Sequence, residues 1–361
     1  MKRKNKTEEK TIDKEKPPIL RIRASHQQIH KFKELGRGGE AVVYKIREDI
    51  AAKVFLLPNA TEFIKNTELQ KAAHVRIIEM QNKLFDFPQD LPEGIVKPSG
   101  VLINEKEQVF GYVMPFIKGL SLDNLSKTST ILPPAITSLL LLSLYDLVNS
   151  LHARGVVIGD LNENNIIVAN GNPHIIDADS TQFGHYKCRS FTPHFTAPEV
   201  LKVINQEISP GGRNGRKICK TILPSYSMTA PHSELTDWYS FMVIAMRLMT
   251  LTDPYGGTIK KMNFAERLEN RVTVFDQRVI YPCVAKPLKD VPRSILDVFF
   301  RVFHRRERFI PERGIFSDPL SIVYYQSKPK KEGSKKCQDR KKVKDVVKVK
   351  IPARVKKSKS K

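Results

Sequence analysis

Three polar residues in one short stretch of the sequence have the types and the spacing that phosphoryl transfer from ATP requires. Asp160 stands after a glycine, Asn165 follows five residues later, and Asp177 comes after a predicted β-hairpin. Phosphoryl transfer spreads negative charge over the phosphate oxygens, so its site needs oxygen ligands for magnesium and one carboxylate that orients the attacking hydroxyl. Two aspartates and an asparagine supply those groups. The alternative is an ordinary loop before a buried strand, because short motifs also arise by chance.

Elements upstream of this stretch could hold the phosphates. Gly36 and Gly38 lie in a predicted strand-turn-strand, where glycines let the backbone close over a phosphate without clashes from Cβ atoms. Lys53 lies on a second apolar strand, ten residues after Val43. A lysine between apolar neighbours predicts a charged partner, since isolated charges rarely leave water. A plain hairpin and a solvent-facing edge lysine are the alternatives.

Residues downstream predict a second ordered segment and a buried helix. An Ala-Pro-Glu tripeptide ends at Glu199, 22 residues after Asp177, and Thr192 stands seven residues before Glu199. A long apolar stretch begins at Asp237, as in a helix with an aspartate near its N-terminus. Each of these features is weak alone. Their order along the chain, after the earlier motifs, is much more specific.

Taken together, these motifs resemble those of the protein kinase superfamily over roughly residues 30 to 325. The resemblance implies an α+β fold with two lobes: a small antiparallel β-sheet lobe with one main helix, and a larger, mostly helical lobe. It also implies ATP and Mg²⁺ as cofactors, Asp160 as the catalytic base, and Asn165 and Asp177 as magnesium ligands. Asp237 would hold the backbone of the catalytic loop. The pattern is similar to divergent bacterial serine/threonine kinase-like proteins, and also to small-molecule kinases of the aminoglycoside and choline type.

The resemblance further implies how the smaller lobe holds the nucleotide. Lys53 would bind the α- and β-phosphates and pair with a glutamate of the helix predicted at 61–85. Glu68, fifteen residues after Lys53, is the expected partner, and Glu79 is the alternative.

Adenine would lie against the strand and hinge predicted at 109–117. The carbonyl of Pro115 and the amide of Ile117 would read adenine between apolar walls, as in most cofactor pockets. The expected nucleotide-binding residues are Gly36, Gly38, Ala41, Val43, Ala51, Lys53, Glu68, Met114, Pro115, Ile117 and Ile167.

The chain departs from the family pattern at three places. Ile158 and Gly159 replace the usual His-Arg before the base, so control by a phosphorylated activation loop is not expected. Asn162 stands where a lysine normally touches the γ-phosphate, which removes a charge and predicts a lower rate or a different acceptor. Ala178 replaces the phenylalanine of the DFG motif. The expected catalytic group is Asp160, Lys53, Asn162 and Thr192, with Thr192 bonded to the base.

Composition predicts how the chain is organised. With 361 residues, of which 40% are hydrophobic, one two-lobed body with tails is expected. The apolar run at 136–151 is too short for a bilayer, so we expect a buried helix before the catalytic loop and no transmembrane segment. The expected parts are a disordered basic N-terminal segment at 1–27, an N-lobe at 28–117, a C-lobe at 118–326 with a loop insertion at 202–234, and a disordered lysine-rich tail at 327–361.

The net charge of +23 is concentrated near the end of the chain. Residues 328–361 hold 16 Lys or Arg and 3 acidic residues, which gives +13. Such a segment has too few apolar residues to offset its ordering entropy. It predicts a polyanionic partner, nucleic acid or an acidic protein, with anionic lipid and a plain solubilising role as alternatives. The four cysteines lack metal-ligand spacing and predict a reducing, cytoplasmic location, and we expect a monomer.

Three functions fit these observations, and the first is preferred. They are a serine/threonine kinase that phosphorylates proteins, a small-molecule phosphotransferase, and a pseudokinase that binds a partner without catalysis. Thr192 and the tripeptide ending at Glu199 favour the first over the second, because they shape a peptide-docking segment. The presence of a lysine, a base and two metal ligands together counts against the third, since a scaffold needs none of them.

Overall fold

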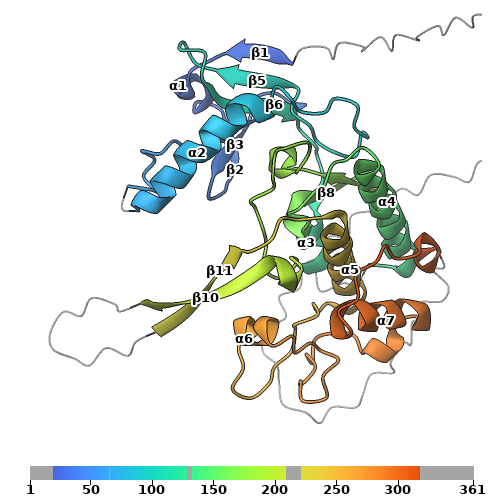
Figure 1. The fold of residues 1–361 in the computed structure, drawn as a ribbon. Helices are drawn as coiled ribbons and strands as arrows, with labels where there is room; N and C mark the ends of the chain where they lie inside the picture. Colours follow the sequence, from blue (N-terminus) through green and yellow to red (C-terminus); the bar gives the residue numbers. More distant parts are fainter. Residues whose placement is uncertain (1–18, 65, 128–131, 209–220, 318–361) are drawn as a thin grey trace, which may run out of the picture. The chain divides into compact units, whose positions relative to one another are not determined.

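The computed structural model describes residues 19–64, 66–127, 132–208 and 221–317 (Figure 1). These residues form two compact units. Unit 1 extends to Leu91 and resumes at Val96–Phe116, and unit 2 comprises Pro92–Ile95 and the chain from Ile117 onward. The start of unit 2 at Ile117 lies one residue from the predicted lobe boundary. The tail at 327–361 and positions 1–18, which were predicted to be disordered, lie outside the described residues.

Unit 1 is built on a six-stranded sheet in the order β1-β5-β6-β4-β3-β2. Its side chains alternate between the two faces, so that Val42 and Tyr44 of one strand, and Ala52 and Val54 of the next, enter the core. The edge strand β1 runs parallel to β5, and the other neighbours are antiparallel. The strands are β1 (Leu20–Arg23), β2 (Lys33–Arg37), β3 (Ala41–Lys45), β4 (Ile50–Phe55), β5 (Gly100–Ile103) and β6 (Val109–Pro115).

Two helices complete unit 1. The short helix α1 (His26–Ile29) has a capping box in which Ser25 and Gln28 bond each other's backbone. The long helix α2 (Thr67–Lys83) begins after Asn66, whose side chain accepts hydrogen bonds from the backbone N–H groups of Glu68 and Leu69. α2 packs against β6 and contributes the fully buried Ala73 to the core. The predicted main helix of the small lobe is therefore present.

The strand β1 corrects the expectation that the whole of 1–27 is disordered. Its register with β5 runs from Leu20 opposite Gly100 to Arg23 opposite Ile103. A Cβ added to Gly100 would lie 2.9 Å from Cδ1 of Ile22, so the glycine leaves room for this side chain. The charged composition concealed the strand, because β1 depends on pairing with a neighbour far away in the sequence.

Unit 2 is mostly helical around a three-stranded sheet in the order β7-β8-β9. Its elements include β7 (Leu120–Ser121), β8 (Ile166–Ala169), β9 (Asn172–Ile175), α3 (Leu122–Lys127), α4 (Pro134–His152), α5 (Glu234–Thr250), α6 (Phe264–Glu269) and α7 (Arg293–Phe299). A π-helix at Phe300–His304 follows α7 directly. The structure is thus mixed α+β, with an N-terminal, mainly antiparallel sheet and a helical C-terminal region, as predicted.

Helices α4 and α5 pack against each other in the core of unit 2. α5 is buried almost throughout, and a helix that is apolar on all sides belongs in a core. The ring of Tyr145 on α4 lies 4.5 Å from that of Trp238 on α5. By length and composition α4 could cross a membrane, but half of its apolar window is buried inside the protein. It is the buried helix that was predicted to precede the catalytic loop.

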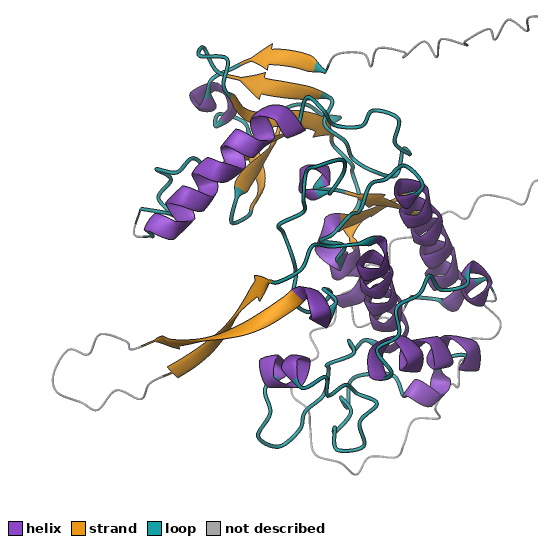
Figure 2. Ribbon diagram, viewed as in Figure 1, coloured by secondary structure: helices purple, strands orange, loops and turns teal. Residues whose placement is uncertain are grey.

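The predicted insertion at 202–234 contains the two strands of a β-hairpin (Figure 2). Strands β10 (Leu201–Ile208) and β11 (Thr221–Met228) pair antiparallel from Leu201 opposite Met228 to Ile208 opposite Thr221. The positions between the strands lie outside the described residues. The sequence predicted an insertion here without its secondary structure, because Pro224 and the turn residues nearby concealed two β-forming runs.

Candidate active site

One buried aspartate holds the backbone at the start of the catalytic loop. Asp237, in the first turn of α5, is fully buried. Its Oδ2 accepts a hydrogen bond from the backbone N–H of Ile158 (2.7 Å), and its Oδ1 accepts one from Gly159 (2.8 Å). Nε2 of His152, at the end of α4, lies 2.9 Å from Oδ2. The predicted role of Asp237 in holding this backbone is confirmed.

Gly159 explains why no arginine precedes the base. Its φ of +78° lies in the left-handed region, which costs an L-residue energy that glycine avoids. A Cβ at this position would also lie 2.5 Å from Sγ of Cys188 and 3.2 Å from the ring of His232. Both the backbone and the packing therefore require a glycine immediately before Asp160.

Asp160 is held by a compact set of hydrogen bonds. Oγ1 of Thr192 donates to Oδ1 of Asp160 (2.8 Å), as the resemblance implied. The side-chain amide of Asn162 donates to the backbone carbonyl of Asp160 (3.0 Å) and to Oγ1 of Thr192 (3.1 Å). Oδ1 of Asn162 accepts from the backbone N–H of Asn164 (3.0 Å). These bonds fix both the backbone and the carboxylate of Asp160.

Asn162, which the sequence placed in the catalytic group at the position of the phosphate-binding lysine, is bonded within the loop. Its side chain is only 2% exposed and points into the loop, where three hydrogen bonds use both ends of the amide. It bonds the backbone carbonyl of Asp160 and the hydroxyl of Thr192. Asn162 is therefore a positioning residue.

The two predicted magnesium ligands are brought together by the hairpin of β8 and β9. The backbone N–H of Ile176, next to Asp177, donates to the carbonyl of Asn165 (2.9 Å). Nδ2 of Asn165 donates to the carbonyl of Asp160 (3.0 Å), so its Oδ1 is the atom left to bind a cation. Asp177 has a left-handed backbone with φ of +67°, a strained conformation that is common at functional sites. A carboxylate and an amide oxygen are suitable ligands for magnesium.

The expected phosphate-binding residues of unit 1 lie on one β-hairpin and the strand beside it. Val43 of β3 stands opposite Lys53 of β4, and the backbone N–H of Gly38 donates to the carbonyl of Ala41 (2.9 Å). A Cβ on Gly36 would meet nothing within 4 Å. Within unit 1, therefore, no neighbouring atom requires a glycine at this position.

The expected adenine-binding residues belong to both units. In unit 1, Ala51 stands opposite Met114, both are buried, and Pro115 ends β6. In unit 2, Ile117 opens the unit, and Ile167 stands on β8 opposite Ser121. Their assignment to adenine stays a prediction.

The structure favours Glu79 over Glu68 as the partner of Lys53. Glu68 lies in the first turn of α2, where its side chain is 81% exposed and pairs with Lys71 at 3.0 Å. Glu79 lies three turns later on the same side of the helix and is partly buried, as Lys53 is. A partly buried lysine needs a partner that is itself shielded from water. We therefore expect Glu79 to pair with Lys53.

The Ala-Pro-Glu tripeptide is tied to the C-terminal part of unit 2. The guanidinium of Arg308 makes two bonds to the Glu199 carboxylate, one of them 2.7 Å long, and Arg271 lies 3.5 Å from the same group. Burial would raise the pKa of Glu199, but the bonds and charges of Arg308 outweigh it and lower that pKa below the usual value. The charged carboxylate ties the end of the segment from Thr192 to Glu199 to these two arginines.

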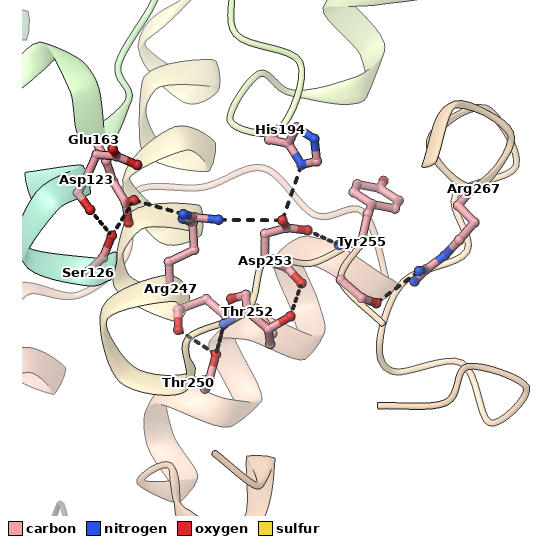
Figure 3. Close-up of polar contacts among 12 residues, drawn as sticks. Asp123, Ser126, Glu163, His194, Arg247, Thr250, Thr252, Asp253, Tyr255 and Arg267 are labelled. Atoms are coloured by element: carbon pink, nitrogen blue, oxygen red, sulfur yellow. Dashed lines mark hydrogen bonds and ion pairs between the residues drawn. The ribbon is translucent and has the colours of Figure 1, made fainter. Parts of the chain in front are cut away.

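Sequence reasoning missed a set of charged residues beside the catalytic loop (Figure 3). Glu163 is fully buried three residues after the base, and it forms an ion pair with Arg247 of α5 (3.0 Å). Arg247 in turn lies 3.7 Å from Asp253, and Asp253 lies 3.3 Å from Nδ1 of His194. A signal was available, because an arginine inside the apolar stretch of α5 predicts a buried acidic partner.

Comparison with known proteins agrees with this geometry. The family model of the protein kinase domain matches residues 29–214, and the chain belongs to that family. Serine/threonine-protein kinase PknD of Chlamydia muridarum (strain MoPn / Nigg) is 23% identical over 290 residues, which cover 75% of this chain and 29% of that relative. PknD of Chlamydia felis (strain Fe/C-56) is 24% identical over 275 residues, or 72% and 28% of the two chains.

A plant relative is also similar. Serine/threonine-protein kinase OXI1 of Arabidopsis thaliana is 23% identical over 268 residues, which cover 64% of this chain and 62% of the relative. The chain thus spans less than a third of the length of the PknD relatives and less than two thirds of OXI1. The family typically uses ATP and magnesium.

Proposed function

We propose that this protein transfers the γ-phosphoryl group of ATP to serine or threonine hydroxyls of proteins. The observation that carries the proposal is the hydrogen bond from Thr192 to Asp160, on a loop whose backbone is held by Asp237. This arrangement fixes a carboxylate oxygen and places a hydroxyl-bearing side chain beside it. The base and the segment that would dock the acceptor are therefore parts of one bonded unit.

Each residue has a defined task in the proposed reaction. Asp160 orients the acceptor hydroxyl and receives its proton as the hydroxyl oxygen bonds the γ-phosphorus, while the bond from that phosphorus to the β–γ bridging oxygen breaks and ADP leaves. Thr192 and Asn162 hold Asp160 in place. Magnesium, when bound, would neutralise charge on the phosphate oxygens, and the Oδ1 of Asn165 and the carboxylate of Asp177 would be its protein ligands.

Lys53 and the glycines of the β2–β3 hairpin would bind the phosphates. The lysine supplies positive charge, and the open space at Gly36 leaves room for a phosphate near the backbone. Asn162 supplies no such charge, so the positive charge on the phosphates would come from Lys53 and magnesium. A modest turnover is therefore expected relative to kinases with the additional lysine.

The choice of serine and threonine rests on the position of Thr192. Its hydroxyl bonds Asp160 directly, and we infer a shallow site there that suits a short acceptor side chain. A tyrosine would need its ring held further from the base. The ion pairs at Glu199 support a protein acceptor, because they order the segment on which a peptide would dock.

The test uses the full chain with labelled ATP, magnesium and a generic basic protein, followed by phosphoamino-acid analysis. Asp160→Asn should remove the base and Asp177→Ala a metal ligand, and each should lower the rate by about two orders of magnitude or more. Asp146→Asn is the matched control, because Asp146 forms an exposed pair with Arg313 away from the site. Thermal unfolding should show that all three variants stay folded.

The outcomes separate the alternatives. Undiminished transfer by both active-site variants would refute the assignment of the base and metal ligand, and dominant phosphotyrosine would refute the acceptor. Transfer to a small-molecule hydroxyl without transfer to protein would favour the aminoglycoside- or choline-kinase type. Absence of any transfer by the unaltered chain would favour the pseudokinase scaffold.

A further inference from the structure

A chain of charged side chains in unit 2 links the catalytic loop to the segment that precedes the Ala-Pro-Glu tripeptide (Figure 3). Glu163 belongs to the catalytic loop, Arg247 to the last turn of α5, and His194 to the segment between Thr192 and Glu199. The terminal nitrogens of Arg247 serve different partners: one lies 3.0 Å from Glu163, and the other lies 3.7 Å from Asp253. Asp253 then reaches His194 at 3.3 Å.

These contacts close a ring that contains the base. Starting from Asp160, the ring passes through Thr192 to His194, then through Asp253 and Arg247 to Glu163, which returns to Asp160 three residues earlier in the sequence. Figure 3 draws the three contacts between the charged side chains of this ring. The remaining links are the hydrogen bond from Thr192 to Asp160 and two stretches of two to three residues along the chain. A shift at one point of this ring can therefore be passed on to Asp160 or to the segment between Thr192 and Glu199.

Arg247 also touches the docking segment directly. Its guanidinium lies over the ring of Phe195, 5.3 Å from the centroid, and the carbonyl of Phe195 accepts a hydrogen bond from Ser240 on α5 (2.9 Å). His194, the neighbour of Phe195, stacks on Phe264 of α6 with 3.9 Å between ring centroids. Phe195 thus packs on α5, and His194 packs on α6.

The burial of the pair explains why an arginine is needed. Glu163 has no exposed surface, and a carboxylate removed from water requires a hydrogen-bonded cation. Burial alone would lower the pKa of Arg247, but the bond to Glu163 and the charges of Glu163, Asp253 and Asp123 raise it. The planar fork of arginine can serve two carboxylates on different segments, which a lysine ammonium cannot do equally well.

We propose that Arg247 is a positioning residue, which sets the distance between the catalytic loop and the acceptor-docking segment and so determines how a protein acceptor meets Asp160. This inference rests on the proposed kinase function. A role limited to stability is the competing explanation. It predicts that loss of Arg247 weakens folding and lowers every activity together, with no selective effect on the acceptor.

The test compares variants of the full chain on a serine- or threonine-containing peptide that the unaltered protein phosphorylates. Arg247→Met should lower kcat/KM for the peptide by about tenfold or more, because small misplacements of a reactant are costly. KM for ATP and peptide-independent ATP hydrolysis should change much less. Arg247→Lys should recover part of the loss, since it keeps the charge but not the fork.

A milder variant keeps the test decisive if Arg247→Met does not fold. His194→Phe preserves the stack on Phe264 but removes the contact with Asp253, and His194 is half exposed, so folding should tolerate it. We expect KM for the peptide to rise about two- to fivefold, as for loss of a partly exposed pair. Arg313→Met is the matched control, because it breaks an arginine–carboxylate pair elsewhere in unit 2.

The outcomes distinguish this inference from the proposed function. An unaltered chain that phosphorylates no protein or peptide would refute both. An active unaltered chain, with peptide kinetics unchanged in His194→Phe, would refute the positioning role alone. Proportional loss of peptide transfer and ATP hydrolysis in Arg247→Met, together with a lower melting temperature, would show that the ring only stabilises the fold.

Discussion

At the scale of single residues, the amide of Asn162 bonds the backbone of Asp160, at the position where the family usually has a lysine. Asn162→Asp keeps the acceptor oxygen that bonds the N–H of Asn164, but it removes the amide protons that bond Asp160 and Thr192. We expect kcat to fall about tenfold, because a general base must stay within hydrogen-bond reach of its proton. Steady-state kinetics on a peptide would measure the loss.

The control for Asn162→Asp makes the same change of charge two residues away. Asn164 is exposed, so Asn164→Asp should leave kcat close to that of the unaltered protein. Equal losses in the two variants would show that added negative charge, and not loss of the amide bonds, is responsible. Asn162→Lys is expected to be worse than Asn162→Asp, since a side chain that is 2% exposed leaves an ammonium group without water.

The partner of Lys53 is a second question at this scale. Glu79→Gln should raise KM for ATP and lower kcat by about tenfold or more, because Lys53 would lose the charge that orients it. Glu68→Gln makes the same change on an exposed pair with Lys71. It should change the free energies that correspond to KM for ATP and to kcat by less than about 1 kcal/mol. ATP titrations and peptide kinetics on both variants decide the matter. A larger effect for Glu68→Gln would restore the assignment made from spacing alone.

At the scale of elements, the turn into the catalytic loop depends on one glycine. Gly155→Ala and Gly159→Ala place an alanine at nearly equal positive φ, +70° and +78°, so both carry the backbone penalty of about 1–2 kcal/mol. At Gly155 the new Cβ meets nothing within 4 Å, whereas at Gly159 it would lie 2.5 Å from Sγ of Cys188. Gly159→Ala should therefore cost about 1–3 kcal/mol more, as overpacking does.

Chemical denaturation of the two glycine variants would measure that difference. Because Gly159 immediately precedes Asp160 and bonds Asp237, its replacement should also lower activity by more than the fraction of unfolded protein explains. Equal stabilities of the two variants would mean that Cys188 can move aside freely. The tight packing around the loop would then not explain the missing arginine.

The elements that could be predicted from the sequence are those fixed by local motifs. Asp160, Thr192 and Asp237 stand at family spacings, and their bonds are as expected. The edge strand β1 could not be predicted, because no family motif marks it and its charged composition conceals a strand that forms only by pairing with β5. The Arg247–Glu163 pair was missed for the same physical reason: it forms between an apolar helix and a loop that only the tertiary fold brings together.

At the scale of the whole molecule, the expected machinery is divided between the two units. The glycines and Lys53 belong to unit 1, and the base, the metal ligands and the docking segment belong to unit 2. Phosphoryl transfer would require both. The charge of +13 at 328–361 follows all of these residues in the sequence. Its effect should therefore be separable from catalysis.

We propose that the segment from Lys328 to Lys361 binds nucleic acid through its charge and leaves phosphoryl transfer unchanged. If several of its 16 cations neutralise phosphates, log affinity for duplex DNA should fall with log salt with a slope near −0.9 per contact. A chain ending at Gln326 should lose this binding and keep its turnover on a small peptide.

A permuted tail of the same composition should bind as well as the natural one, because the attraction does not depend on sequence. Tight binding by the shortened chain would assign the contact to the rest of the protein, and equal affinity for an acidic polypeptide would show that nucleic acid is not preferred.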